Sequence, residues 1–291
     1  MIKLQTPVPD LTCRLEIGYK NKIMLLGSCF SDNIGTILKN YGFNVLTNPF
    51  GALYNPLSIA QSILRIADCR EFMRTECIPI GAGDQRICSH WHHTSFARNT
   101  EEEFLSNAND RLHEAHDFLK ECDTVIITLG TSQVFDKKGI TVNNCLKQPA
   151  KEFTRRRLDS TEILESLQKI IRESNIGKEK RYIFTVSPVR HLADGAHNNQ
   201  LHKAALLLGT DQILDMASQN GITADYFPAY EIMMDELRDY RFYAEDLCHP
   251  SAQAVNYIAE RFLNWVLPAE EHTLLEAAIK KYKSSLHISK A

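Results

Sequence analysis

Apolar runs and helix-like repeats alternate along most of the chain. Runs of consecutive apolar residues, several of them β-branched, predict buried strands at 23–26, 43–46, 124–129, 181–186 and 222–226. Apolar residues spaced three or four positions apart predict helices at 32–40, 57–67, 101–120, 160–174, 198–220 and 252–266. This alternation predicts an α/β fold, with a parallel sheet and helices on both faces.

Three stretches do not follow the alternation. Short β pieces around two glycines predict a small inserted β region at about 76–97, and 136–158 is predicted to be irregular apart from a hairpin that Lys138 and Gly139 could form. We expect residues 1–20 to form an N-terminal arm, 21–266 to form the main domain, and 267–291 to supply a charged helix (about 270–284) packed outside.

Five loops are expected at one edge of the sheet. Right-handed crossovers bring the carboxyl ends of parallel strands to the same edge, where open α/β sheets bind their ligands. The loop at Asp246–His249 should close over that edge. The other four loops are 27–32, 48–55, 130–133 and 187–191.

The turn after the first strand is the strongest candidate for chemistry. The apolar run stops at Gly27, and Ser28 and Cys29 lead into a helix, so the turn should display one of these two side chains. A thiol at a helix N-terminus is shifted toward thiolate by the partial positive charge there. The alternative is that Cys29 only packs, since free cysteine is among the most buried residue types.

Asp246 and His249 are candidates for the base that such a nucleophile needs. Three residues apart at a tight turn or helix start, their side chains can meet on one face. Asp246 would then hold one ring nitrogen of His249 while the other faces the nucleophile, and Pro250 suits the first helical position. The alternative is a helix-capping aspartate beside a surface histidine.

Other residues of these loops could complete a site for acyl transfer or ester hydrolysis. The helix-start amides, an amide from the Gly51 turn and the Ser132 side chain could stabilise an oxyanion. Arg190 and His191 could bind substrate, or could only cap the sheet edge.

The segment His90–His93 raises a metal hypothesis. In a strand, His90 and His92 share a face with Cys88, and imidazole is a common zinc ligand. No second cluster completes a site, so we favour no metal. A substrate-contacting loop or polar lid, anchored by Trp91 and Phe96, is the alternative.

Composition narrows the class of protein. The 291 residues are 44% hydrophobic and 24% charged, with a net charge of -3 and no basic stripe, which argues against nucleic acid as the main partner. No apolar stretch approaches a membrane span or a signal peptide, and the 8 cysteines show no CxxC pair. We expect a cytoplasmic protein with mostly free thiols and no cofactor.

Several of these segments together resemble the signature of the GSCFA-domain family, in the same order and over roughly residues 20–265. The resemblance is carried by Leu26–Ser31 (LGSCFS), Asn48–Gly51, Leu53–Pro56, Trp91–His93, Thr128–Ser132, Ser187–His191 and Asp246–Ser251. Ser31 stands where the family name has Ala, a small residue for a small one.

That family is similar to the SGNH/GDSL hydrolases, so the resemblance implies a three-layer, flavodoxin-like fold and their block pattern. The Gly-Asp-Ser block falls on Gly27–Cys29 and puts Cys29 at the nucleophile position. The glycine block would be met by Gly51, and the Gly-x-Asn block falls on Gly130–Ser132, with Ser132 replacing the oxyanion asparagine. The Asp-x-x-His block is met by Asp246 and His249. Two of the four blocks are therefore altered.

Together, residues and resemblance predict a hydrolase or acyltransferase for an acyl ester, of a carbohydrate or other small molecule, acting through an acyl-enzyme on Cys29. Ser28 is the rival nucleophile. The alternatives are a ligand-binding protein of the same fold that has lost catalysis, and a metal-assisted hydrolase. The residues expected to contact substrate are Asn48, Tyr54, His92, His93, Arg190 and His191.

Overall fold

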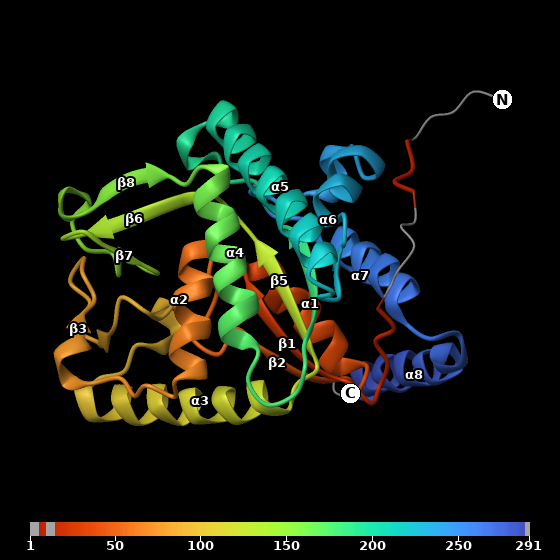
Figure 1. Cartoon of the computed structure of the whole chain (residues 1–291), viewed down its shortest axis with the longest axis horizontal. Helices are drawn as coiled ribbons and strands as arrows, with labels where there is room; N and C mark the ends of the chain where they lie inside the picture. The colour runs from red at the N-terminus through yellow and green to blue at the C-terminus, as the bar shows by residue number, and fades with distance from the viewer. Residues whose placement is uncertain (1–5, 10–14, 289–291) are drawn as a thin grey trace.

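A five-stranded parallel sheet forms the centre of the computed structural model, which describes residues 6–9 and 15–288 (Figure 1). Its strand order is β10-β9-β5-β1-β2, which is the order 2-1-3-4-5 of a flavodoxin-like fold when only the sheet strands are counted. The α/β prediction is therefore confirmed. The strands are β1 (Lys22–Gly27), β2 (Asn44–Thr47), β5 (Thr124–Leu129), β9 (Arg181–Val186) and β10 (Ala224–Tyr226).

Alternate residues of the strands face two separate cores. Met24 and Leu26 of β1 pack with the helices α2 (Pro56–Ala67), α3 (Glu101–Glu121), α4 (Ser160–Ser174) and α5 (Ala196–Gln219). Ile23 and Leu25 pack on the opposite face, against α1 (Cys29–Asn40) and α7 (Ala252–Val266). Figure 1 shows α2, α4 and α5 on the near side of the sheet. The three layers follow from central strands that bury apolar residues on both faces of the sheet.

Most predicted elements agree closely with the structure, but α1 begins three residues earlier than the predicted 32. Ser28 is its N-cap and accepts a hydrogen bond from the Phe30 amide at 3.3 Å. Cys29 is therefore the first helical residue rather than part of an extended turn. This shift places the thiol directly at the carboxyl edge of β1.

Two small antiparallel sheets lie outside the main sheet. The inserted region pairs β3 (Ile78–Pro79) with β4 (Ile87–Cys88). The stretch predicted to be irregular forms a three-stranded sheet of β6 (Gln133–Lys137), β7 (Ile140–Val142) and β8 (Thr154–Arg157), at the upper left of Figure 1. Only the hairpin at Lys138 and Gly139, both with positive φ, was expected there.

The irregular prediction was wrong because β8, with the sequence TRRR, carries no apolar alternation. Tertiary pairing specifies this strand instead: it lies along β6, and Arg156 forms an ion pair with Asp136 at 2.9 Å. Strand propensity depends on such neighbours more than on the strand's own residues.

The ends of the chain add little to the sheet. The C-terminal helix α8 (His272–Ile288) buries Leu275 in the core beneath α1 and α7, and Tyr282 meets Tyr41 edge-on at 6.0 Å. Residues 1–5 and 10–14 of the predicted N-terminal arm lie outside the described residues, and so do residues 289–291. The division of the chain into an arm, a main domain and an outer helix stays a prediction.

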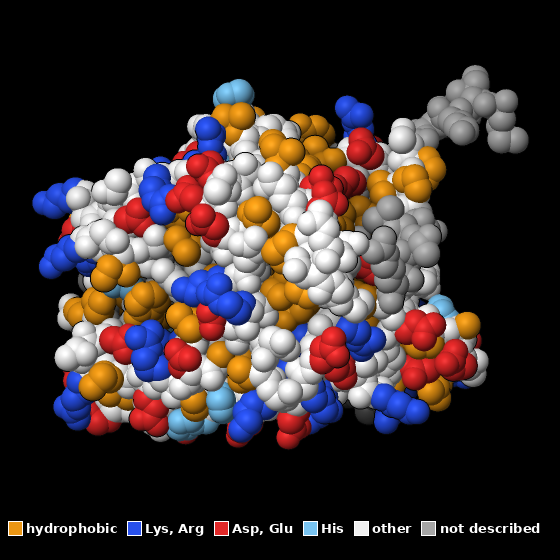
Figure 2. Space-filling model, viewed as in Figure 1, with side chains coloured by type: hydrophobic (Ala, Val, Ile, Leu, Met, Phe, Trp, Pro, Cys, Tyr) orange, Lys and Arg blue, Asp and Glu red, His pale blue; other side chains and the backbone are white. Residues whose placement is uncertain are grey.

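The surface agrees with the small net charge. Basic and acidic side chains are interspersed over the face in Figure 2. Within the described residues, the helices are all too short or too polar to cross a bilayer.

Candidate functional site

The turn after β1 is held by a close contact with the neighbouring strand. A side chain at Gly27, whose φ is +141°, would place its Cβ 2.1 Å from the carbonyl oxygen of Thr128, so the two strand ends meet only because this residue is glycine. The amide of Ser28 donates to the same carbonyl at 3.1 Å. Asn48 Oδ1 accepts from the Gly27 amide at 2.9 Å and thereby ties in the loop after β2.

The two candidate nucleophiles differ in their exposure. Ser28 is fully buried: its hydroxyl donates to Ser187 Oγ at 3.0 Å and accepts from the Phe30 amide. Cys29 is partly exposed and lines a cavity of about 490 Å³ at the carboxyl edge of the sheet. Only the thiol of this pair faces a space that a substrate can enter.

Asp246 and His249 line the same cavity as Cys29. Nδ1 of His249 lies 2.5 Å from Asp246 Oδ2, and Asp246 Oδ1 accepts from the amides of Cys248 and His249, both at 2.9 Å. These amides, followed by the His249 side chain, lower the pKa of Asp246 to about 2, so it remains a carboxylate. The bond to Asp246 uses Nδ1 and leaves Nε2 for proton transfer.

The thiol of Cys29 does not have the lowered pKa that its helix N-terminus suggested. Burial, followed by the charge of Asp32, raises the pKa of Cys29 above its ordinary value. The amides of Cys29 and Phe30 and the charge of Lys203 act in the opposite direction, but they do not prevail. Cys29 is therefore a protonated thiol at neutral pH and needs a base.

The two predicted oxyanion residues do not line the cavity. The Gly51 amide donates to the Asn48 carbonyl at 2.8 Å. Ser132 is fully buried, with its hydroxyl 2.9 Å from His202 Nδ1. A side chain at Gly51 would place its Cβ 2.3 Å from His93 Cβ, so this glycine lets two loops pack together. A part for either residue in holding an oxyanion stays a prediction that this arrangement does not favour.

Half of the expected substrate contacts reach the cavity, namely Tyr54, Arg190 and His191. Asn48 is buried in the turn, where its side-chain amide also donates to Asp32 at 2.8 Å. His93 accepts from the amide of Ser95. Neither Asn48 nor His93 lines the cavity.

His92 is enclosed in the core. Its Nδ1 lies 2.7 Å from Ser89 Oγ, and burial followed by the charge of Arg65 lowers its pKa to about 3. The rings around it are those of Phe50, Phe72, Phe96 and Phe104. A substrate contact for His92 has no support here.

His191 presents a neutral imidazole beside the turn that follows β1. Its Nε2 is buried and has no hydrogen-bond partner within the described residues. It lies 3.4 Å from the position that a Cβ on Gly130 would take, and the Tyr54 ring meets its ring edge-on at 6.0 Å. Burial, followed by the charge of Lys203, lowers the pKa of His191 to about 4, so the ring is uncharged at neutral pH.

One wall of the cavity comes from the antiparallel sheet that the sequence did not predict. Arg155 on β8 lies over the Phe135 ring at 5.3 Å and forms an ion pair with Asp194, which also lines the cavity. The residues of this wall are Gln133, Phe135, Val142, Asn143 and Arg155. Apart from Gln133, which ends a loop expected at this edge, their only signal in the sequence was the hairpin turn.

The described residues contain no group of side chains that supports the metal hypothesis. In the part of the chain that the structure describes, no three His, Cys, Asp or Glu side chains are grouped to hold an ion. His90 Nδ1 bonds the Asn144 carbonyl at 2.8 Å, while Cys88 is buried.

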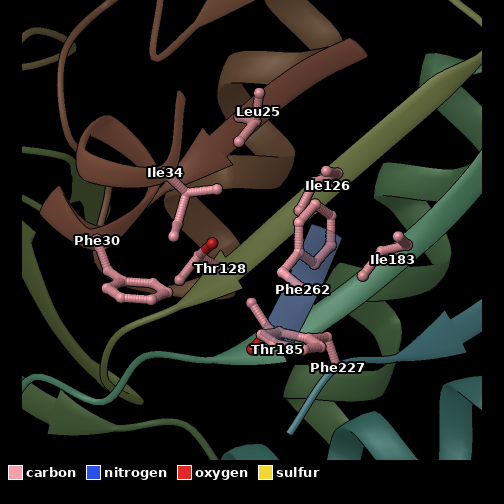
Figure 3. Close-up of a pocket in the computed structure, with 9 residues that line it drawn as sticks. All are labelled: Leu25, Phe30, Ile34, Ile126, Thr128, Ile183, Thr185, Phe227 and Phe262. Atoms are coloured by element: carbon pink, nitrogen blue, oxygen red, sulfur yellow. The ribbon is translucent and has the colours of Figure 1, made fainter. Parts of the chain in front are cut away.

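A second, much smaller cavity of about 10 Å³ lies on the α1 and α7 face of the sheet (Figure 3). It is a gap in packing rather than a ligand site, because it has room for about one water molecule and an almost wholly apolar lining. The residues around it are Leu25, Phe30, Ile34, Ile126, Thr128, Ile183, Thr185, Phe227 and Phe262.

Fold and site together define a three-layer α/β protein with a thiol, an imidazole and a carboxylate in one cavity at the edge of its parallel sheet. The chain belongs to the GSCFA family, whose sequence profile matches residues 22–262. A comparison with curated proteins finds no match.

Solved structures with a similar course of the chain include three esterases of low sequence identity. A Clostridium thermocellum family 3 carbohydrate esterase is 13% identical, with 88% of this chain and 98% of that chain covered and a TM-score of 0.38. A mutant of Axe2, an acetyl-xylooligosaccharide esterase from Geobacillus Stearmophilus, is 11% identical (87% and 96% covered, TM-score 0.42). An aryl esterase of M. Smegmatis is 10% identical (84% and 98% covered, TM-score 0.39).

Proposed function

We propose that this protein is an SGNH-type hydrolase or acyltransferase that acts on an acyl ester through a covalent acyl-enzyme on Cys29. The observation that carries the proposal is that Cys29, Asp246 and His249 line one cavity, with His249 hydrogen-bonded to Asp246. Nucleophiles on unrelated folds are activated by an imidazole that a carboxylate orients in this way.

In the first half of the reaction, His249 Nε2 takes the thiol proton while the Cys29 sulfur attacks the ester carbonyl carbon. When the tetrahedral intermediate collapses, the bond to the alcohol oxygen breaks and His249 returns the proton to that oxygen. Cys29 is left as a thioester. Asp246, with its low pKa, stays ionised and stabilises the imidazolium throughout.

In the second half, water or an acceptor hydroxyl gives its proton to His249 and attacks the thioester carbonyl. The bond to sulfur then breaks, and the proton passes from His249 to the Cys29 sulfur. Water as the attacking group gives hydrolysis, and a hydroxyl of a second substrate gives acyl transfer.

The developing oxyanion needs donors at the cavity. Gly51 and Ser132 are engaged elsewhere, so we favour the helix-start amide of Cys29 and the neutral imidazole of His191, with Nε2 carrying the proton. His191 would then act on the reacting atoms rather than only on the remainder of the substrate.

A carbohydrate ester suits the lining of the cavity. The aromatic side chains of Tyr54 and Phe135 offer apolar faces to a sugar ring, while Asn143 and Arg190 offer hydrogen bonds to its hydroxyls. The seven free cysteines among the described residues support a reducing compartment such as the cytoplasm.

The test is acyl labelling by p-nitrophenyl acetate, followed by intact-protein and peptide mass spectrometry. We expect one acetyl group on Cys29, no adduct in Cys29→Ala and a much slower adduct in His249→Ala. Cys248 lines the same cavity, so Cys248→Ala is the matched control for unspecific thiol acylation and should label as the wild type does. Equal labelling of Cys29→Ala would refute the proposal, and a folded wild type that never labels would favour a ligand-binding protein.

A further inference from the structure

Lys203 is a buried cation that the reaction proposed above does not use. It lies on α5, only 1% of it is exposed, and its ammonium group donates to the carbonyls of Gly130 and Ser187, both at 2.7 Å. These carbonyls belong to the loops that follow β5 and β9. The charge therefore lies under the floor of the cavity, where the strand ends meet.

The surroundings of Lys203 do not balance its charge. The buried Arg65 has Glu76 at 2.5 Å, whereas no described carboxylate forms an ion pair with Lys203. Two carbonyls satisfy two of its three donors, and the Tyr230 ring lies 5.6 Å away. A buried ammonium without a counter-charge is costly, which calls for an explanation.

Hydrogen bonds connect this ammonium group to the nucleophile turn. Lys203 holds the carbonyl of Ser187, and the hydroxyl of Ser187 accepts from Ser28, the residue before Cys29. Cys29 is the titratable group whose negative charge acts on Lys203, while Lys203 in turn favours the ionised form of Cys29. Burial lowers the pKa of Lys203 to about 7.

We infer that Lys203 is a positioning residue that acts through Cys29, because its ammonium group stabilises the Cys29 thiolate from beneath the cavity floor. The inference deepens the proposed function and rests on Cys29 being its nucleophile. As the thiol loses its proton to His249, the protonated form of Lys203 balances the negative charge on sulfur; since the pKa of Lys203 is about 7, part of the molecules carry this charge at neutral pH. This charge offsets part of the burial that keeps the thiol protonated at rest.

Other charges act on the same pair. Asp32 opposes ionisation of Cys29, and burial, followed by the Cys29 charge, raises the pKa of Tyr54. On the other side, the charge of Lys203 disfavours the protonation of His191 and His202, and His249 likewise disfavours it at His191. Lys203 is the cationic side chain of this group that favours the thiolate.

The pH profile of Cys29 alkylation by iodoacetamide tests this inference, since the rate follows the thiolate fraction. The variants Lys203→Met and Lys203→Gln remove the charge, and Gln keeps a donor for the two carbonyls. Because the pKa of Lys203 is about 7, we expect both variants to alkylate Cys29 about 10-fold more slowly than the wild type at pH 6 and at the wild-type rate at pH 9. Alkylation of Cys248 in the same digests should not change.

Lys180 provides a matched control. It is also a buried lysine, 3% exposed, whose ammonium group donates to two backbone carbonyls, those of Ile176 and Lys178. These carbonyls precede β9, at the end of the strand away from the cavity, so Lys180→Met should lower stability and leave the pH profile of Cys29 alkylation unchanged. If the Lys203 variants are also less stable but keep the wild-type pH profile of Cys29 alkylation, Lys203 has only a structural role and the inference is wrong.

A second measurement keeps the lysine intact, in case its variants do not fold. The Cε NMR shift of Lys203 should titrate at higher pH in Cys29→Asp, whose carboxylate stands in for the thiolate, than in the wild type, and an unchanged midpoint would overturn the inference. The two proposals can fail separately. Acetyl labelling of Cys29 with an unshifted alkylation profile removes only the role of Lys203, whereas a shifted profile without any acyl adduct removes only the acyl transfer.

Discussion

Two loops of this molecule carry a histidine in the same local arrangement and use it differently. In each, a polar residue three positions earlier binds Nδ1: Ser89 holds His92 at 2.7 Å, and Asp246 holds His249 at 2.5 Å. His92 is fully buried among phenylalanine rings, whereas 49% of the His249 side chain is exposed, at the cavity that Cys29 lines. The spacing sets the orientation of the ring, and burial decides whether the ring can exchange protons.

The residue that binds Nδ1 adds to the difference between the two histidines in their ability to accept a proton. The pKa of Asp246 is lowered to about 2, so its carboxylate can balance an imidazolium on His249. Ser89 carries no charge and offers His92 no such balance, and burial holds the pKa of His92 at about 3. One loop is therefore suited to acid–base chemistry and the other to packing.

The largest expected effect is on His249. His249→Ala should slow acetyl labelling of Cys29 by about 10²–10⁴-fold, because it removes the proposed base. Since the ring is half exposed, the urea midpoint should stay close to that of the wild type. Labelling at the wild-type rate would mean that the two loops do not differ in chemistry.

His92→Ala should show the opposite pattern. Removing a fully buried ring leaves a cavity among aromatic side chains and should lower the free energy of unfolding by about 2–4 kcal/mol. Labelling of Cys29 per folded molecule should be unchanged. Urea denaturation and labelling at saturating reagent measure the two quantities, and a selective loss of labelling would place His92 in the site after all.

A smaller effect is expected from pH. The folded pKa of His92, about 3, lies below its ordinary value, so the unfolded chain takes up a proton first as the pH falls. Its contribution to stability is full above about pH 6.5 and is lost by up to about 1.4 kcal/mol per pH unit toward pH 3. His191 acts in the same direction down to about pH 4.

Urea unfolding at pH 7 and pH 5.5 measures this loss. His92→Phe should reduce the difference between the two pH values without removing it, because His191 remains. An identical pH dependence in His92→Phe and the wild type would show that the buried ring does not control acid stability.

The smallest effect is expected at Ser28. Ser28→Ala removes the N-cap of α1 and the bond to Ser187, which should lower the free energy of unfolding by about 1 kcal/mol. Acetyl labelling should persist, because Cys29, and not Ser28, lines the cavity. Loss of the adduct in a folded Ser28→Ala protein would transfer the nucleophile role to Ser28.

Local pattern was enough for the main sheet and its helices. Thr124–Leu129 and Ser160–Ser174 have the predicted ends, because a continuous apolar run and a capped amphipathic repeat each specify a single element. Strand β8 was missed, because its three arginines pair with β6 through contacts that no local pattern encodes.

The sequence by itself determined the α/β alternation, the glycine turn that carries Cys29, and the short spacing that lets Asp246 hold His249. These depend on residues close together in the chain, where periodicity and turn chemistry act. Only the tertiary structure decided that Ser28, Ser132 and His92 are buried, that β8 supplies a wall of the cavity, and that the Lys203 ammonium group binds the carbonyls of Gly130 and Ser187. Burial and charge are set by residues far apart in sequence, and the pKa of each group follows from them.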